Sequence, residues 1–244
     1  GSAATSPLGQ VLYNDKNVIG NVGPQMENLI HLDQQTIQVA PKADAKVTGT
    51  ISMPNTPVDG IIAGGVTFSL PASKNADAVE TTVAVLARNT RNLPATTAEL
   101  HAVSYEKVNK QTGFAVAVAN TSGSFINGAT FTTKIINVAT KKTVIEETRR
   151  NAQLAPNSTM TYWVKNNVKN LPGGKYRVQV VPNWSGMNQT WQKQINLPKT
   201  TAPVTQKPQK VPFMKALLYA FSLLAIVAIV LAVMWFKNMR FLVK

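Results

Sequence analysis

One uncharged stretch near the C-terminal end constrains this chain more than any other feature. The segment Ala216–Phe236, ALLYAFSLLAIVAIVLAVMWF, holds 21 residues without a charge or a proline. As a helix rising about 1.5 Å per residue, it would span about 30 Å, the hydrocarbon thickness of a bilayer. Tyr219 and Trp235 lie near its two ends, and Lys215 and Lys237 flank it, as expected at membrane interfaces. The sequence therefore predicts a single transmembrane helix and contact with membrane lipid.

The charges around this helix do not decide its orientation, because three basic residues precede it closely and three follow it. We expect the large preceding region to face the exterior or the cell wall, with the short basic tail, residues 237–244, in the cytoplasm. Residues 198–215 are rich in Pro and Lys and predict an extended linker. Within this region, Leu197–Thr201 (LPKTT) is similar to a sortase signal. It departs from one at Thr201, where glycine is expected, and whether it is processed stays open.

The composition argues against an enzyme and against a metal or cofactor site. The chain has no cysteine and only two histidines, which leaves little material for thiolate sites, zinc sites or catalytic triads. Two pairs of residues could act as an acid–base pair, His31 with Asp33 and Glu99 with His101. Neither pair has a nucleophile or a third partner. We expect no catalytic residue, no metal ligand and no cofactor.

The positive charge is confined to one part of the chain. All 11 acidic residues lie before residue 148, whereas 14 of the 25 Lys and Arg residues lie after it. Such a basic half would be attracted to anionic wall polymers or lipid headgroups, although a merely solubilising surface explains it equally well. The positive charges are dispersed and no recognition motif accompanies them, so nucleic acid is not expected as a partner.

Short strands separated by turn residues dominate the region before the linker. Alternating or apolar runs that predict strands are residues 46–53, 61–70, 81–87, 114–119, 130–138, 160–164, 175–181 and 191–197. Gly64-Gly65 within the second run indicates a bulge or a close backbone approach. The run 81–87 is apolar enough to be a central strand. The fold class expected is all-β: two immunoglobulin-like sandwiches, residues 1–92 and 93–197, followed by the transmembrane helix.

Three segments resemble the WxL-interacting proteins of Gram-positive bacteria, over about residues 10–244. The first begins at Met53-Pro54 and continues through Pro57–Gly65 (PVDGIIAGG), which contains Asp59-Gly60 and Gly64-Gly65. The second is Leu154–Ser158 (LAPNS), with Pro156-Asn157 at its centre. The third is Leu171–Tyr176 (LPGGKY), with Gly173 and Tyr176, followed by Trp191 and a closing strand.

This resemblance implies a peptidoglycan-binding domain followed by a host-binding domain. It implies two kinds of partner, WxL-domain surface proteins and peptidoglycan or another wall polymer; a host matrix protein belongs to the alternative hypothesis below. It brings no catalytic residues. The chain begins Gly-Ser-Ala-Ala-Thr without a leader, so we expect the first domain to contain only the C-terminal part of its family's fold. The signature residues form turns, and we interpret them as structural rather than as ligand contacts.

The best candidate for a partner contact is Trp184, with Asn183 and Asn188 beside it. These residues lie in a loop between two predicted strands, where an aromatic side chain is expected to be exposed, whereas Trp163 and Trp191 are expected in the core. Two functions follow as hypotheses. The first is a non-catalytic, membrane-anchored surface scaffold that binds cell wall and WxL-type proteins. The alternative is an adhesin that binds an extracellular matrix protein of the host.

Overall fold

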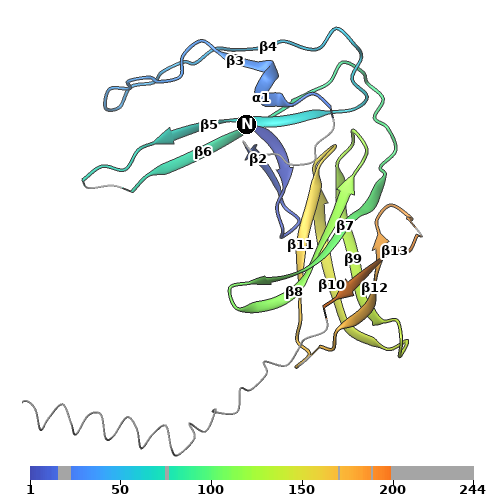
Figure 1. The fold of residues 1–244 in the computed structure, drawn as a ribbon. Coiled ribbons are helices and arrows are strands. Elements are labelled where there is room, and N and C mark those ends of the chain that lie inside the picture. Colours follow the sequence, from blue (N-terminus) through green and yellow to red (C-terminus); the bar gives the residue numbers. More distant parts are fainter. Residues whose placement is uncertain (16–22, 75–76, 170, 188, 199–244) are drawn as a thin grey trace, which may run out of the picture. The chain divides into compact units, whose positions relative to one another are not determined.

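The computed structural model describes residues 1–15, 23–74, 77–169, 171–187 and 189–198 (Figure 1). Antiparallel strands are the main element of these residues, and α1 (Met26–Leu29) is their only α-helix. No helix of this described part is long and apolar enough to cross a membrane. The predicted transmembrane segment, the tail and nearly all of the linker lie outside the described residues. For the residues described, the predicted all-β class is confirmed.

The first part of the chain is built around one four-stranded antiparallel sheet with the spatial order β2-β1-β5-β6. Its strands are β1 (Ser2–Thr5), β2 (Val11–Asp15), β5 (Ile62–Leu70) and β6 (Val79–Ala87). Between β2 and β5 the chain forms α1 and then a long arm, residues 30–51. The two ends of the arm pair as a short two-stranded sheet of β3 (Ile30–Leu32) and β4 (Gly49–Ile51).

Three expectations for this first part differ from the structure. The described residues form one sheet and an arm here, without the second packed sheet that a sandwich requires. The expected central strand, β6, lies at the sheet edge, because β5 is its only partner among the described residues. The expected half-buried strand over residues 46–53 is reduced to β4, whose residues are exposed. Alternation in sequence reports which residues could share a face, but not whether another layer covers that face.

Gly64 allows β5 to lie against α1. A Cβ atom added to Gly64 would come within 2.6 Å of the Met26 side chain, which is fully buried. The close backbone approach predicted for Gly64-Gly65 is therefore confirmed. Around it, Met26, Ile62 and Ala87 form a small apolar cluster that anchors α1 on the sheet.

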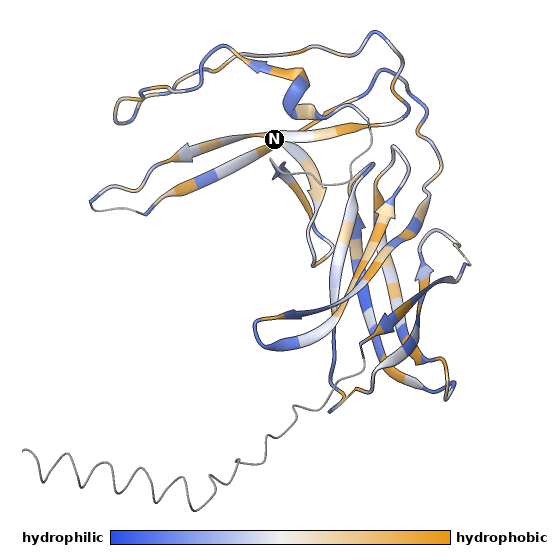
Figure 2. Ribbon diagram, viewed as in Figure 1, coloured by the Kyte–Doolittle hydropathy of each residue, from blue (hydrophilic) through white to orange (hydrophobic). Residues whose placement is uncertain are grey.

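The second part of the chain consists of two antiparallel sheets that enclose a common core. One has the order β10-β9-β12-β13 and the other the order β11-β8-β7. The strands are β7 (Ala98–Val108), β8 (Gln111–Asn120), β9 (Ile126–Asn137), β10 (Thr143–Leu154), β11 (Thr159–Lys165), β12 (Gly174–Asn183) and β13 (Trp191–Leu197). Hydrophobic and hydrophilic residues alternate along several of these strands (Figure 2), as strands with one buried face require.

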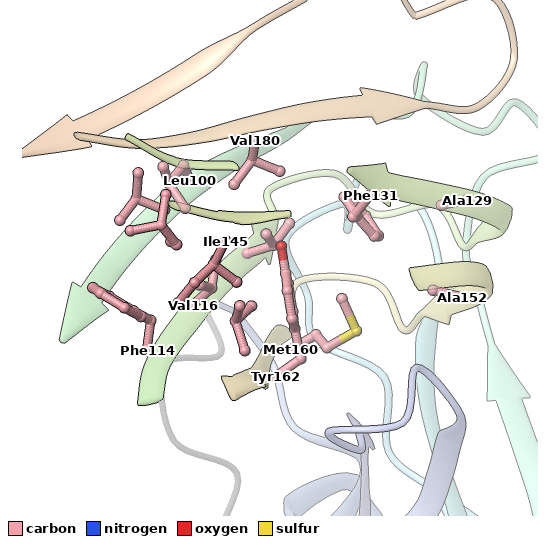
Figure 3. Close-up of a cluster of buried hydrophobic side chains, with 14 of the residues drawn as sticks. Leu100, Phe114, Val116, Ala129, Phe131, Ile145, Ala152, Met160, Tyr162 and Val180 are labelled. Carbon is pink, nitrogen blue, oxygen red and sulfur yellow. The ribbon is translucent and has the colours of Figure 1, made fainter. Parts of the chain in front are cut away.

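The core between these sheets is large and closed. Tyr176, Val178 and Val180 of β12 are fully buried, which confirms their predicted inward orientation. Figure 3 shows Tyr162 and Met160 of β11 within this cluster, with Phe131 of β9 nearby. The strands β8, β9, β11, β12 and β13 appear where the sequence predicts them. β7 and β10 are not among the predicted strands, because their charged and polar residues obscure the alternation.

Candidate functional site

The Asp59-Gly60 turn fastens the first part of the chain to the second. Gly60 is buried, with a φ of 100°, and lies directly against the backbone of Gly123. Immediately after it, the Ile61 amide donates a 2.8 Å hydrogen bond to the Gly123 carbonyl. Only glycine combines this left-handed conformation with so close an approach. The Asp59 side chain is exposed.

A second set of bonds joins β1 to the Leu154–Ser158 turn. The Thr5 hydroxyl accepts a 2.9 Å hydrogen bond from the Ala155 amide and shares a 2.7 Å hydrogen bond with the Ser158 hydroxyl. Ser158 in turn donates to the Ala155 carbonyl at 2.8 Å. All three residues are buried, so water does not compete for these bonds.

The side chain of Asn120 holds the second part's side of this junction in place. Its amide nitrogen donates to the Ser124 carbonyl at 2.8 Å and to the Ala155 carbonyl at 2.9 Å. Its amide oxygen accepts bonds from the Ser122 amide and the Ser122 hydroxyl, at 3.0 and 2.8 Å. Asn120 is 2% exposed, so these bonds satisfy its polar atoms in place of water.

These contacts define what we call the junction: Gly60, Ile61 and Thr5 on one side, and Gly123 and the Leu154–Ser158 turn on the other. Small apolar residues complete it, with Ala3, Ala63 and Ala155 packed in one cluster. Two of the three signature segments of the sequence therefore meet at one place in the fold. Both segments are recognisable in the sequence, whereas no sequence pattern marks Thr5 or Asn120 as part of the junction.

The other signature residues lie apart from the junction. Pro54 is half-buried in the connection between β4 and β5, and Gly65 bonds through its backbone to Gly1. Tyr176 is fully buried, and its hydroxyl donates a 2.8 Å bond to the Pro172 carbonyl, which braces the turn that contains Gly173.

Trp184 does not lie where the sequence analysis placed it. Its side chain is 4% exposed and contacts the Phe131 and Trp191 rings, with centroids 6.1 Å away in each case. Its indole N–H donates a 3.1 Å bond to the Thr96 hydroxyl. A tight turn, in which the Met187 amide bonds to the Trp184 carbonyl, directs the ring back over the core. The expected exposure of Trp184 is therefore wrong.

The neighbours of Trp184 differ from it. Asn183 is exposed at the end of β12, and Asn188 lies outside the described residues. Trp163 and Trp191 were expected in the core, and both are half-buried. Trp191 packs against the core, beside the Phe131 and Trp184 rings. Trp163 does not, because it follows the buried Tyr162 and so points to the opposite face of its sheet.

A cavity opens between β5 and the arm. It has a volume of 530 Å³, and one of its walls is formed by Gly65, Val66, Thr67 and Ser69 of β5. The opposite wall is formed by Ile30, His31, Leu32 and Gln35 of the arm. We call this cavity the slot. It continues into a more apolar groove of 760 Å³, between Phe68, Leu70 and Val79 on the sheet and Ile37, Val39 and Val47 on the arm.

The two histidines lie in separate exposed positions. His31 lines the slot, while Asp33 accepts a 3.0 Å hydrogen bond from the Thr48 amide and so braces the arm. His101 lies 3.9 Å from Glu99, and both side chains are more than half exposed. Among the described residues there is no cluster of three or more side chains that could hold a metal ion.

Tyr162 is the one group of the described residues with a clearly shifted pKa. Burial raises its pKa to about 12, against an opposing effect of its 2.7 Å hydrogen bond with Thr133 and of the nearby Arg149 charge. The Arg149 guanidinium lies 5.2 Å from the ring centroid and pairs with Glu147 at 3.4 Å. Because the raised pKa means that the folded state favours the protonated phenol, stability is retained below about pH 10. It falls as the pH rises from about 10 to about 12.

We therefore expect the wild-type chain to lose about 2–3 kcal/mol of unfolding free energy over this pH interval beyond what Tyr162→Phe loses. The variant lacks the titrating hydroxyl and is about 1 kcal/mol less stable at neutral pH, where Thr133 loses its partner. Urea unfolding at several alkaline pH values measures the difference. Parallel pH profiles for the two proteins would show that Tyr162 does not titrate as described.

The described residues before the linker form two parts that the junction joins. Comparison with known families defines these parts as modules. The peptidoglycan binding domain of WxL Interacting Protein matches residues 1–70, and the host binding domain of the same protein matches residues 76–206. The chain belongs to the WxL-interacting protein family, as the sequence resemblance predicts. No curated protein and no solved structure matches the chain.

Proposed function

We propose that this protein is a non-catalytic scaffold on the surface of a Gram-positive cell, which holds a WxL-type surface protein at the cell wall. Membership of the family implies peptidoglycan binding and interaction with host or WxL partners. We propose in addition that a single chain contacts the cell wall and the WxL-type protein at the same time. Residues 1–70 would face the wall, and the following module would present the partner site.

The junction is the observation that carries this proposal. A flexible connection would let the two modules bind independently, whereas the junction joins them through backbone and side-chain bonds. The Ile61 amide bonds to Gly123, and Thr5 bonds to both Ala155 and Ser158. Residues 1–199 accordingly form one compact unit. A rigid connection of this kind suits a protein that positions one partner relative to another.

Membrane attachment is part of the same proposal. The apolar segment 216–236 and its basic flanks support a single transmembrane helix with the C-terminus in the cytoplasm. Removal of residues 216–244 from the protein in cells should release it from the membrane fraction. If it remained membrane-bound, the proposed anchor would be wrong.

Binding of the chain, in detergent, to purified peptidoglycan and to a WxL domain tests the function. We expect binding to both, with the WxL contact retained at high salt. A wall contact made only by the basic half would fade as salt screens it. Salt-sensitive wall binding without any WxL binding would contradict the scaffold.

A host-directed adhesin is the second candidate, and the description of the module that matches residues 76–206 favours it. Binding of the chain to an immobilised extracellular matrix protein, in the absence of WxL protein, would support this alternative. Competition between the matrix protein and the WxL domain would show that the two candidates use the same surface.

A further inference from the structure

We infer that one lysine-rich end of the second part of the chain rests on the anionic headgroups of a lipid membrane. The turns after β7 and β9, the loop after β11 and the first residues of β12 form this end. The inference deepens the proposed function and rests on its membrane anchor, because it states how the second part is held once the anchor is in the bilayer.

Seven lysines gather at this end, and all of them are exposed. They lie in turns or within three residues of a strand end: Lys107, Lys110, Lys141, Lys142, Lys165, Lys169 and Lys175. Among the described residues of these turns and strand ends, Glu106 is the only acidic one. The Val138 amide bonds to the Lys175 carbonyl at 3.0 Å, and so joins the turn after β9 to β12. The Asn166 amide bonds to the Thr112 carbonyl at 2.9 Å, and so joins the loop after β11 to β8. We call this surface the basic end.

Two exposed valines accompany the lysines. Val108 is 47% exposed in the β7–β8 hairpin, and Val138 is 38% exposed in the turn after β9. Over the described residues between 98 and 197, these are the only exposed large hydrophobic side chains. Apolar side chains beside lysines suit a bilayer interface, where the apolar group enters the headgroup region and the ammonium group approaches phosphate. A soluble anionic polymer would leave the valines in water, so this combination favours a lipid surface.

The chain leaves the second part at the same end. Leu197, the last residue of β13, pairs with Gly174, the neighbour of Lys175. Residues 198–215 then lead to the apolar segment 216–236. Fully extended at about 3.1 Å per residue, this linker would span about 56 Å, so the anchor would keep the basic end within that distance of the bilayer. Such tethering raises the effective concentration of the lipid surface, and lysines that each contribute only about fivefold then suffice for contact.

This contact would also give the protein a direction. β8 runs from Gln111 at the basic end to Asn120 at the junction, and its ten residues span about 33 Å. β10 likewise begins at the basic end and finishes at Leu154, in the junction turn. Contact at the basic end therefore directs the junction away from the membrane, toward the side on which the cell wall lies.

A fluorescent label tests the contact directly. The chain has no cysteine, so one introduced cysteine gives one labelled position. Thr140→Cys labels the exposed turn after β9, and Asn127→Cys labels an exposed position at the junction end of the same strand. The full chain is reconstituted in vesicles that contain a lipid with a quenching headgroup. The other lipid is phosphatidylcholine, alone or mixed with phosphatidylglycerol. We expect phosphatidylglycerol to increase quenching at residue 140 at least about threefold and at residue 127 less than about 1.5-fold.

The chain offers a matched pair of charge variants. Lys141→Glu with Lys142→Glu changes the basic end, whereas Lys42→Glu with Lys46→Glu makes the same change of charge on the arm. Lys141 and Lys42 are both exposed and have similar positive φ values of 57° and 62°, so the substitutions meet similar backbone conformations. At about fivefold per lysine, the first pair should lower the ratio of docked to undocked protein at least about 25-fold, and the second should leave it unchanged. High salt should act like the first pair.

The remaining outcomes would overturn the inference. Equal quenching in the two kinds of vesicle, or equal effects of the two charge pairs, would do so but leave the anchor standing. Recovery of the full chain apart from the vesicles would overturn the anchor and the inference together. A label at residue 140 that responds to soluble poly(glycerol phosphate) but not to phosphatidylglycerol vesicles would assign the basic end to a wall polymer instead.

Discussion

Asn120→Ala is expected to destabilise the protein by about 3–5 kcal/mol, because it removes several hydrogen bonds from buried polar groups at once. The Ser122 amide loses its acceptor, the Ser122 hydroxyl as a donor keeps only a 3.3 Å bond to the Ser124 carbonyl, and the carbonyls of Ser124 and Ala155 each lose one of two donors. Truncation leaves a space in a site that is 2% exposed, with polar groups that cannot all reach water. Urea unfolding followed by tryptophan fluorescence measures the loss.

Asn127→Ala is the control for this variant. Asn127 is exposed and accepts a single 3.3 Å hydrogen bond from Gln153, so its removal should change stability by less than about 0.5 kcal/mol. A loss of less than about 1 kcal/mol for Asn120→Ala would contradict the description of Asn120 as the residue that holds the junction, because one orphaned buried group alone costs about that much.

Gly60→Ala is expected to open the junction. The added methyl group would collide with the Gly123 backbone, and the residue would have to keep a φ of 100°. Overpacking costs about 1–3 kcal/mol and a left-handed alanine about 1–2 kcal/mol, so we expect a loss of about 2–5 kcal/mol in the free energy that holds the two modules together. Amide exchange at Ile61, whose N–H bonds to Gly123, should accelerate accordingly.

Gly128→Ala separates the two contributions to that loss. Gly128 has a φ of 65°, and an added Cβ would meet nothing within 4 Å, so this variant carries the left-handed strain without the collision. It should lose about 1–2 kcal/mol and leave exchange at Ile61 unchanged. If the two alanine variants behaved alike, close contact at Gly60 would not be what secures the junction.

The sequence predicts the second module better than the first, and the reason is physical. Residues 175–181 alternate because two packed sheets bury every second side chain, and β12 forms there with Tyr176, Val178 and Val180 inside. Residues 46–53 alternate equally well, yet β4 is short and exposed. Alternation is a property of the chain, whereas burial depends on a second layer that a single segment does not specify.

The candidate site shows the same limit. The signature turns are recognisable because glycine, proline and asparagine mark unusual backbone conformations, and Gly60 and Asn157 do have positive φ values. The contacts that bring the two turns into one junction are long-range and are not specified by either segment. Thr5 and Ser158, for example, are 153 residues apart. The predicted exposure of Trp184 is wrong for a related reason. A loop position usually means an exposed side chain, but the turn after β12 directs the Trp184 ring back to the core.

The most direct test of the scaffold is co-sedimentation of a WxL domain with purified peptidoglycan in the presence and absence of the full chain. If the chain bridges the two, the WxL domain will enter the pellet only when the chain is present, at high salt as well as at low salt. Displacement of the chain from peptidoglycan by the WxL domain would show that the two contacts exclude each other, and would contradict a protein that bridges them.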